Sequence, residues 1–89
     1  MSDVHDNPAR SRYELEEDGH IAFVAYKIGP GMIDFIHTEV PKELGGRGIG
    51  SKLAQGVLAA ARARGLKVKA TCPFIAAYVK KHPETADLA

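Results

Sequence analysis

The spacing of apolar and polar residues predicts two strands joined by a tight turn near the start of the chain. Residues 12–16 alternate and indicate a short edge strand, and Glu17-Asp18-Gly19 has the composition of a hairpin turn. In the second strand, residues 20–28, apolar side chains fall on both faces, so we expect both faces to be covered.

A third strand is predicted over residues 32–40, after the turn Gly29-Pro30-Gly31. Pro41 ends this strand because proline cannot donate a hydrogen bond to the ladder. Regular alternation would place one set of its side chains on a common face, namely Ile33, Phe35, His37 and Glu39. Thr38 and Val40 would then face the other way.

At Ile49 the spacing of apolar residues changes from every second residue to every third or fourth residue. Apolar residues at helical spacing form one stripe, made of Ile49, Leu53, Val57 and Ala60 or Ala61. Gly65 suits the left-handed position that ends such a helix. The sequence therefore predicts a helix that begins at Ile49 and ends just before Gly65.

A fourth strand and a short helix complete the pattern. Residues 66–71 resemble a strand, and Pro73 suits a first helical turn. On this helix one side would carry Phe74, Ala77, Tyr78 and Lys81, and His82-Pro83 would close it. A right-handed crossover allows the fourth strand to lie parallel to the third. We expect one α/β (α+β) domain over residues 12–84, with a mobile arm at 1–11 and a frayed tail at 85–89.

Composition narrows the class of protein. A chain of 89 residues forms one domain, and a single cysteine excludes a disulfide framework and fits a reducing compartment. We find no metal-ligand spacing, no signal peptide and no apolar run of membrane-spanning length. A net charge of +1 argues against a nucleic-acid surface. We therefore expect a cytoplasmic protein, a monomer or weak dimer, without membrane or nucleic-acid partners.

The glycine-rich stretch before Ile49 is a candidate phosphate site. A loop that leads into a helix N-terminus exposes backbone N–H groups at the positive end of the helix dipole. The Walker pattern fails because Ser51-Lys52 stand in the wrong order, and the dinucleotide fingerprint fails because its third glycine would fall on Ser51. A flexible loop before a core helix is the alternative interpretation.

Four segments together resemble a known family. They are His37-Thr38-Glu39-Val40-Pro41, the loop from Gly46 to Leu53, Thr71-Cys72-Pro73-Phe74, and Tyr78 to Glu84. In this order they are similar to the very small "acetyltransferase CG" branch of the GCN5-related N-acetyltransferases, over nearly the whole domain. The resemblance implies a truncated acyl-CoA N-acyltransferase fold that keeps the acetyl-CoA half. In it, an antiparallel meander precedes a crossover helix, a parallel fourth strand and a short C-terminal helix.

The resemblance also implies which residues hold acetyl-CoA. Contacts are expected from the third strand and from the loop, at Thr38, Val40, Gly45, Gly46, Arg47, Gly48, Ile49, Gly50, Ser51 and Lys52. The Arg or Gln that opens the family's loop pattern falls on Gly45 here, and Arg47 stands inside the loop instead. Lys80 and Lys81 are further candidates for the phosphates.

Three residues are candidates for catalysis. Cys72 stands where a strand passes into a helix, whose N-terminus favours a thiolate; a small buried hydrophobic role is the alternative. The resemblance places Cys72 beside the acetyl group, as an acyl acceptor, a proton donor or a packing group. It places His37 in the active centre as a candidate general base, where a core histidine is the alternative. Glu39 is a candidate because it is predicted to lie on the same face as His37; the alternative is a solvated charge near the end of the strand.

The resemblance therefore implies an acetyl-CoA-dependent N-acetyltransferase that acts on an unidentified amine. Direct attack of the amine on the thioester is the first mechanism, and a two-step route through acetylated Cys72 is the second. We expect Cys72 and His37 to approach the same point, near the carboxyl ends of their strands. A CoA-binding regulatory module without turnover is the alternative function.

Overall fold

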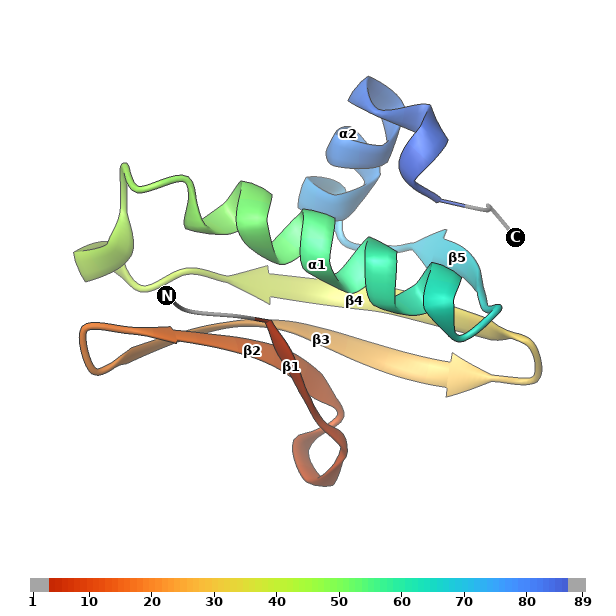
Figure 1. Ribbon diagram of the computed structural model, residues 1–89, viewed down its shortest axis with the longest axis horizontal. Helices are drawn as coiled ribbons and strands as arrows, with labels where there is room; N and C mark the ends of the chain where they lie inside the picture. Colours follow the sequence, from red (N-terminus) through yellow and green to blue (C-terminus); the bar gives the residue numbers. More distant parts are fainter. Residues whose placement is uncertain (1–3, 87–89) are drawn as a thin grey trace.

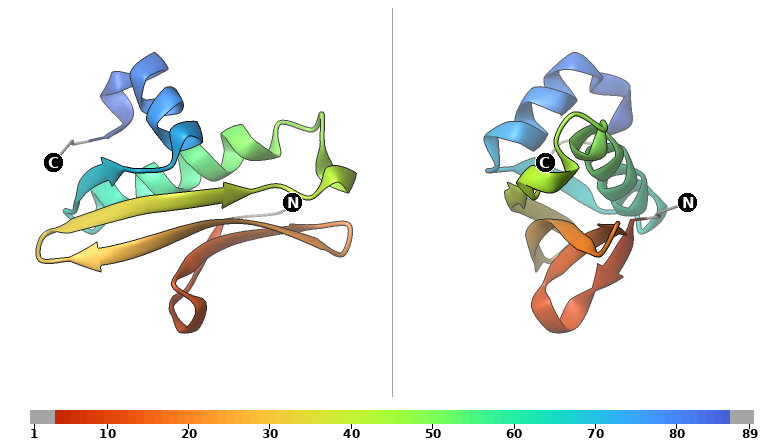
Figure 2. Two further views of the ribbon diagram at one scale, coloured as in Figure 1. Left: turned by 180° about the vertical axis from the view of Figure 1, so that it is seen from behind. Right: turned by 90° about the vertical axis from the view of Figure 1, so that its left-hand side faces the viewer.

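The computed structural model describes residues 4–86 and forms one sheet with two helices on a single face (Figures 1 and 2). The helices are α1 (Ile49–Ala63) and α2 (Pro73–Lys81). The five strands, which lie in sequence order across the sheet, are β1 (His5–Asn7), β2 (Arg12–Glu17), β3 (His20–Gly29), β4 (Met32–Glu39) and β5 (Lys67–Ala70). Short 3-10 helices are η1 (Pro8–Arg10), η2 (Lys42–Leu44) and η3 (Pro83–Thr85).

The predicted crossover is confirmed. Strands β1 to β4 are antiparallel to their neighbours, and β5 pairs with β4 in parallel after α1. Gly65 ends the helical segment in the left-handed region, at φ 69°, and the Leu66 N–H donates to the Ala61 carbonyl at 2.9 Å. These features form a Schellman motif, as the glycine predicted.

Within residues 4–86, neither helix has the length and apolar character needed to cross a membrane.

The core lies between the sheet and the two helices, and the other sheet face stays open. The buried side chains of the sheet include Leu15, Val24, Ile33, Phe35 and Val68, and those of the helices include Leu53, Val57, Ile75 and Val79. Ile21, on the other face, is 42% exposed. The prediction that both faces of β3 are covered is therefore wrong, because both helices pack on the same side (Figure 2). On α2, Ile75 and Val79 are buried and Tyr78 packs partly buried against the core, whereas Phe74 is exposed.

The prediction of a mobile arm is wrong for residues 5–10. Strand β1 pairs antiparallel with β2, so β2 is not the edge of the sheet. The Tyr26 hydroxyl donates a 2.6 Å hydrogen bond to the Asp6 carboxylate, and Arg64 lies 3.9 Å from the same carboxylate. Polar contacts hold β1 itself, and Val4 just before it packs against the core, so a single apolar residue leaves no periodic pattern that would reveal the strand. At the other end η3 is ordered structure, and residues 87–89 of the expected frayed tail lie outside the described part.

A β-bulge interrupts the pairing of β3 with β4. Tyr26 lies opposite Phe35, but its neighbour Ala25 lies opposite His37, so Ile36 has no partner. One extra residue in a strand reverses the alternation of side chains beyond it. Phe35 is consequently buried among the helices, whereas His37 faces the open side of the sheet. The prediction that Ile33, Phe35, His37 and Glu39 share one face is wrong for this reason.

The contact between Tyr26 and Asp6 predicts a loss of stability in alkali. Burial and the neighbouring Asp6 carboxylate raise the pKa of Tyr26 to about 12, from 10.0. Because the folded pKa is the higher one, this stabilisation is complete below pH ~10 and is lost as the pH rises towards ~12. Urea unfolding across this range should show the loss.

The variant Tyr26→Phe should lose about 1 kcal/mol of unfolding free energy at pH 7, because the hydrogen bond to Asp6 is absent. It should also lose less stability than the wild type between pH ~10 and ~12. Tyr78→Phe is the control, since it leaves this hydrogen bond in place. An alkaline loss that is identical in Tyr26→Phe and in the wild type would contradict the assignment.

Candidate functional site

The glycine loop forms an open turn in front of α1. Leu44 is fully buried and anchors the loop to the core, while Gly46 and Gly48 adopt left-handed backbone angles, with φ 78° and 70°. Gly48 is the N-cap of α1 and provides no side chain for the first backbone N–H groups. The positive end of the helix dipole is therefore directed at an exposed loop, which suits a phosphate group.

Arg47 is directed away from this helix end, towards the turn between β2 and β3. Its guanidinium donates to the Asp18 carboxylate and lies 3.5 Å from a Glu17 oxygen. The hydrogen bond from Arg47 is the main reason why the pKa of Asp18 is below its usual value. In the structure, therefore, the partners of Arg47 are carboxylates, and the residue ties the glycine loop to the neighbouring hairpin.

Gly50 contacts an aromatic ring that the sequence patterns did not single out as a site residue. A Cβ atom at Gly50 would lie 2.8 Å from Cζ of Phe74, and the φ of Gly50 is not positive. The side-chain space of Gly50 is thus filled by the ring, which is a packing reason for a glycine here. Phe74 is 41% exposed although it is large and apolar. That exposure is visible only in three dimensions.

Cys72 is held against β4 by two contacts. Its backbone N–H donates to the Phe35 carbonyl at 2.8 Å, and its Sγ lies 3.2 Å from the Thr38 hydroxyl oxygen. The side chain is 3% exposed and stands at the N-cap of α2. Next to it, Thr71 makes two hydrogen bonds to the Asp34 carboxylate, at 3.0 and 3.2 Å. The junction between β5 and α2 is therefore fixed to β4.

The outer edge of β4 is open beyond this junction. Strand β5 pairs with β4 only over Met32–Phe35, after which the chain turns through Thr71 and Cys72 into α2. Within residues 4–86, the edge of residues 36–39 has no neighbouring strand on that side, and α1 begins above it (Figure 1). An open strand edge of this kind can accept an extended ligand through backbone hydrogen bonds.

His37 and Glu39 lie on the open face of the sheet and are not beside Cys72. Their side chains are each 63% exposed, with His37 Nε2 3.4 Å from Glu39 Oε2. The His37 ring also makes an edge contact with Phe23, at 6.1 Å between centroids. The prediction that His37 and Cys72 approach one point is wrong, because the bulge at Ile36 places them on opposite faces. The alternative of a core histidine is also wrong.

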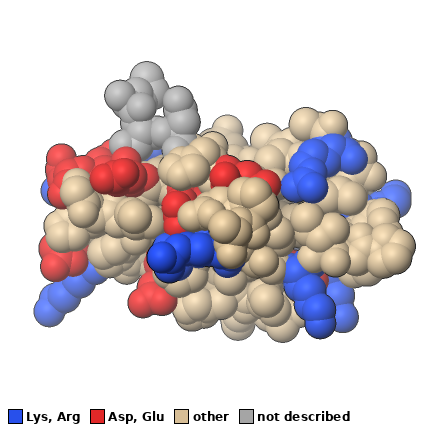
Figure 3. Space-filling model, turned by 90° about the horizontal axis from the view of Figure 1, so that it is seen from below, with Lys and Arg blue, Asp and Glu red and all other residues tan. Residues whose placement is uncertain are grey.

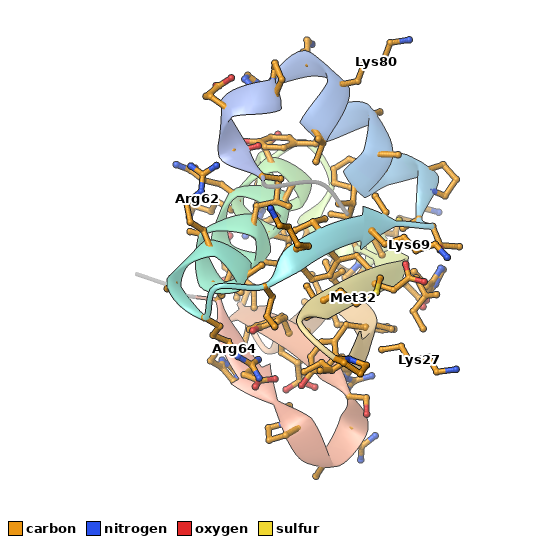
Figure 4. The ribbon with its side chains drawn as sticks, turned by 90° about the vertical axis from the view of Figure 1, so that its right-hand side faces the viewer. Lys27, Met32, Arg62, Arg64, Lys69 and Lys80 are labelled. Atoms are coloured by element: carbon orange, nitrogen blue, oxygen red, sulfur yellow. The ribbon has the colours of Figure 1, made fainter. Side chains whose placement is uncertain are left out.

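Charges are unevenly distributed over the side of the molecule that Figure 3 shows from below. In Figure 3 most acidic side chains lie on the left half, towards the end where β4 finishes, and most basic ones lie in the middle and on the right. Lys27 and Lys69 lie on the sheet side of the molecule in Figure 4, whereas Lys80 projects from the outer part of α2. Lys80 belongs to the last turn of α2, at the opposite end from Phe74. The expected role of Lys80 at the phosphates therefore gains no support.

The sheet, its open β4 edge and the glycine-led helix define an acetyltransferase-type α+β domain, and the comparisons identify the family. The family model Acetyltransf_CG, described as GCN5-related N-acetyl-transferase, matches residues 12–88. The chain belongs to this family.

Relatives and a solved structure agree with this assignment. The chain is 41% identical over 56 residues to Protein NATD1 of chicken (Gallus gallus) and of human, a match that covers 63% of this chain and 51% and 50% of theirs. The chain thus spans about half the length of these curated relatives. An NMR solution structure of a GCN5-like protein from Staphylococcus aureus has a TM-score of 0.72 and 28% identity, with coverage of 97% of this chain and 85% of that one.

The contact between Thr38 and Cys72 predicts how the thiol reacts. Because Cys72 is almost fully buried, iodoacetamide should modify it slowly in the native protein and rapidly after unfolding. If the Thr38 hydroxyl donates to the sulfur, the variant Thr38→Val, which keeps the shape of the side chain but removes the hydroxyl, should slow alkylation by several-fold. Intact mass against time measures the rate. Ser51→Ala, which leaves this contact unchanged, is the control, and equal rates in Thr38→Val and wild type would contradict a functional contact.

Proposed function

We propose that this protein is an N-acetyltransferase that moves an acetyl group from acetyl-CoA to an amine. The observation that carries the proposal is the open edge of β4, which lies between the Thr38–Cys72 contact and the N-terminus of α1. Family membership supports the same conclusion. A cytoplasmic location fits the need for acetyl-CoA, and the domain is expected to act as a monomer or weak dimer.

The two ends of acetyl-CoA would bind to different parts of the site. Backbone N–H groups from Gly46 to Ser51 would hold the pyrophosphate, since they lie at the positive end of α1. The pantetheine arm has two amides and would add to the edge of residues 36–40 as an extra strand, which gives Thr38 and Val40 their expected contacts. The thioester would then lie beside Thr38 and Cys72, where β5 leaves the edge.

The chemistry would use side chains from both faces of β4. His37 would accept a proton from the ammonium form of the acceptor, and Glu39 would hold the imidazole in place. The neutral nitrogen would attack the thioester carbonyl, so that the C–N bond forms as the C–S bond breaks. The proton that the attacking nitrogen then loses would pass to the leaving CoA thiolate. Cys72 and Thr38 would lie at this leaving sulfur. Since Cys72 is almost fully buried, direct attack by the amine is favoured over an acetylated Cys72.

A second function is a CoA-binding module without turnover. The exposure of His37 and Glu39 on an open face favours it, because catalytic groups are usually enclosed and shielded from water. The deciding experiment is intact-mass analysis after incubation with acetyl-CoA, alone and with polyamines, lysine peptides and small amines. An acetylated acceptor supports the transferase, and binding of acetyl-CoA without any mass change in protein or acceptor supports the module.

The glycine loop gives a prediction about binding. Gly48→Asp adds a negative charge where the pyrophosphate would lie, so acetyl-CoA affinity should fall by at least about tenfold, or roughly 1.4 kcal/mol. Gly48→Asn is the matched control, since asparagine has nearly the same size and tolerates the left-handed backbone. Isothermal calorimetry on both folded variants measures the difference. Equal affinities in the two variants would refute the charge argument.

The position of His37 gives a prediction about turnover. If His37 accepts the proton, His37→Ala should lower the rate of acetyl transfer by about 100-fold. Acetyl-CoA affinity should stay unchanged, because the side chain lies on the face away from the glycine loop. His20→Ala, at the start of β3, is the control histidine and should keep both values. A His37→Ala variant with full activity would remove the residue from the mechanism.

A further inference from the structure

Phe74 joins the two helix ends that border the candidate site. It belongs to the first turn of α2, two residues after Cys72, yet its ring rests on Gly50 in the first turn of α1. Phe74 is 41% exposed, although other large apolar side chains of α2, such as Ile75 and Val79, are buried. An exposed ring held in a fixed place between two functional segments is a ready contact for an apolar group.

We infer that the exposed side of Phe74 contacts the pantetheine arm of acetyl-CoA at its branched part. This inference rests on the proposed function. A molecule that reaches from the glycine loop to Cys72 would run close to the ring, because the ring packs on Gly50 in the first turn of α1 and Phe74 stands two residues after Cys72. The part of CoA next to the pyrophosphate carries two methyl groups on one carbon. These methyl groups are therefore the atoms that the ring would cover.

The same contact assigns a specific role to Gly50. The left-handed glycines of the loop, Gly46 and Gly48, are needed for the path of the backbone. Gly50 has no such angle, and a side chain there would enter the ring of Phe74, with Cβ at 2.8 Å from Cζ. Gly50 thus serves the binding of the cofactor indirectly, because it allows the ring to lie against α1 and face the pantetheine.

Two ligands separate this role from the role of the loop. Acetyl-CoA contains both the pyrophosphate and the pantetheine, whereas 3′-phospho-ADP has the nucleotide and pyrophosphate of CoA without the pantetheine. By calorimetry, Phe74→Ala should bind acetyl-CoA about tenfold more weakly than the wild type and 3′-phospho-ADP equally well. Ile28→Ala, which removes another exposed apolar side chain at the far end of β3, is the control and should change neither affinity. Circular dichroism melts check that each variant is folded.

Gly50→Ala tests the packing part of the inference. Its methyl group displaces the ring, so the single variant should also lose acetyl-CoA affinity by about tenfold. In the Phe74→Ala background the same change should add almost nothing, because there is no ring to displace. A loss of the same factor in both backgrounds would overturn the role assigned to Gly50 and show that the glycine serves the phosphate directly.

The outcomes also distinguish this inference from the proposed function. If the wild type binds neither ligand, acetyl-CoA binding itself is wrong and the inference falls with it. If the wild type binds acetyl-CoA and Phe74→Ala binds it equally well, only the inference is overturned. An equal weakening of both ligands by Phe74→Ala would also overturn it, because the ring would then support the loop and not the pantetheine.

Discussion

The bulge at Ile36 is the constraint on which the arrangement of the site depends. Before it, β4 contributes Ile33 and Phe35 to the core, and after it the alternation is reversed. Thr38 is thereby turned towards Cys72, and His37 towards the open face. In a strand without the extra residue, His37 would be buried with the core side chains and Thr38 would lie on the other face. A single unpaired residue thus distributes polar groups to both sides of one strand.

The short pairing of β5 with β4 has an equally local cause. The Cys72 N–H bonds to the Phe35 carbonyl, and Thr71 bonds to Asp34, so the chain is fastened at this point before Pro73 begins α2. Proline suits the first turn of a helix but cannot extend a β-ladder. The strand therefore stops where β4 continues, and an open edge is left next to the buried sulfur. The site is a consequence of where β5 ends.

The one-sided architecture explains how so small a domain can place candidate site residues on both sides of β4. The helices cover one sheet face and form the core with it, which leaves the opposite face to polar and partly exposed residues. On the helix side lie the glycine loop, Cys72 and Phe74, while His37 and Glu39 lie on the open side. Under the proposed function, acetyl-CoA and the acceptor would approach the edge of β4 from different directions, without a second layer of helices.

Most of the secondary-structure elements and their order follow from sequence patterns that act over short distances. The hairpin at Asp18-Gly19, the helix from Ile49, its end at Gly65 and the parallel crossover all follow from local periodicity and turn chemistry, which neighbouring residues set by themselves. The resemblance of four segments to a family of acetyltransferases gave the family and the glycine loop.

Contacts between distant segments decided the rest. Strand β1 is held by the hydrogen bond between Tyr26 and Asp6, and the bulge depends on the register between β3 and β4. The ring of Phe74 packs on Gly50, which belongs to the other helix. None of these leaves a periodic signal, because each joins residues far apart in the chain. The sequence alone therefore determined the elements and the residue types of the candidate site. Only the tertiary structure decided which side of β4 each residue faces, since one unpaired residue in a strand is invisible to a pattern with a period of two.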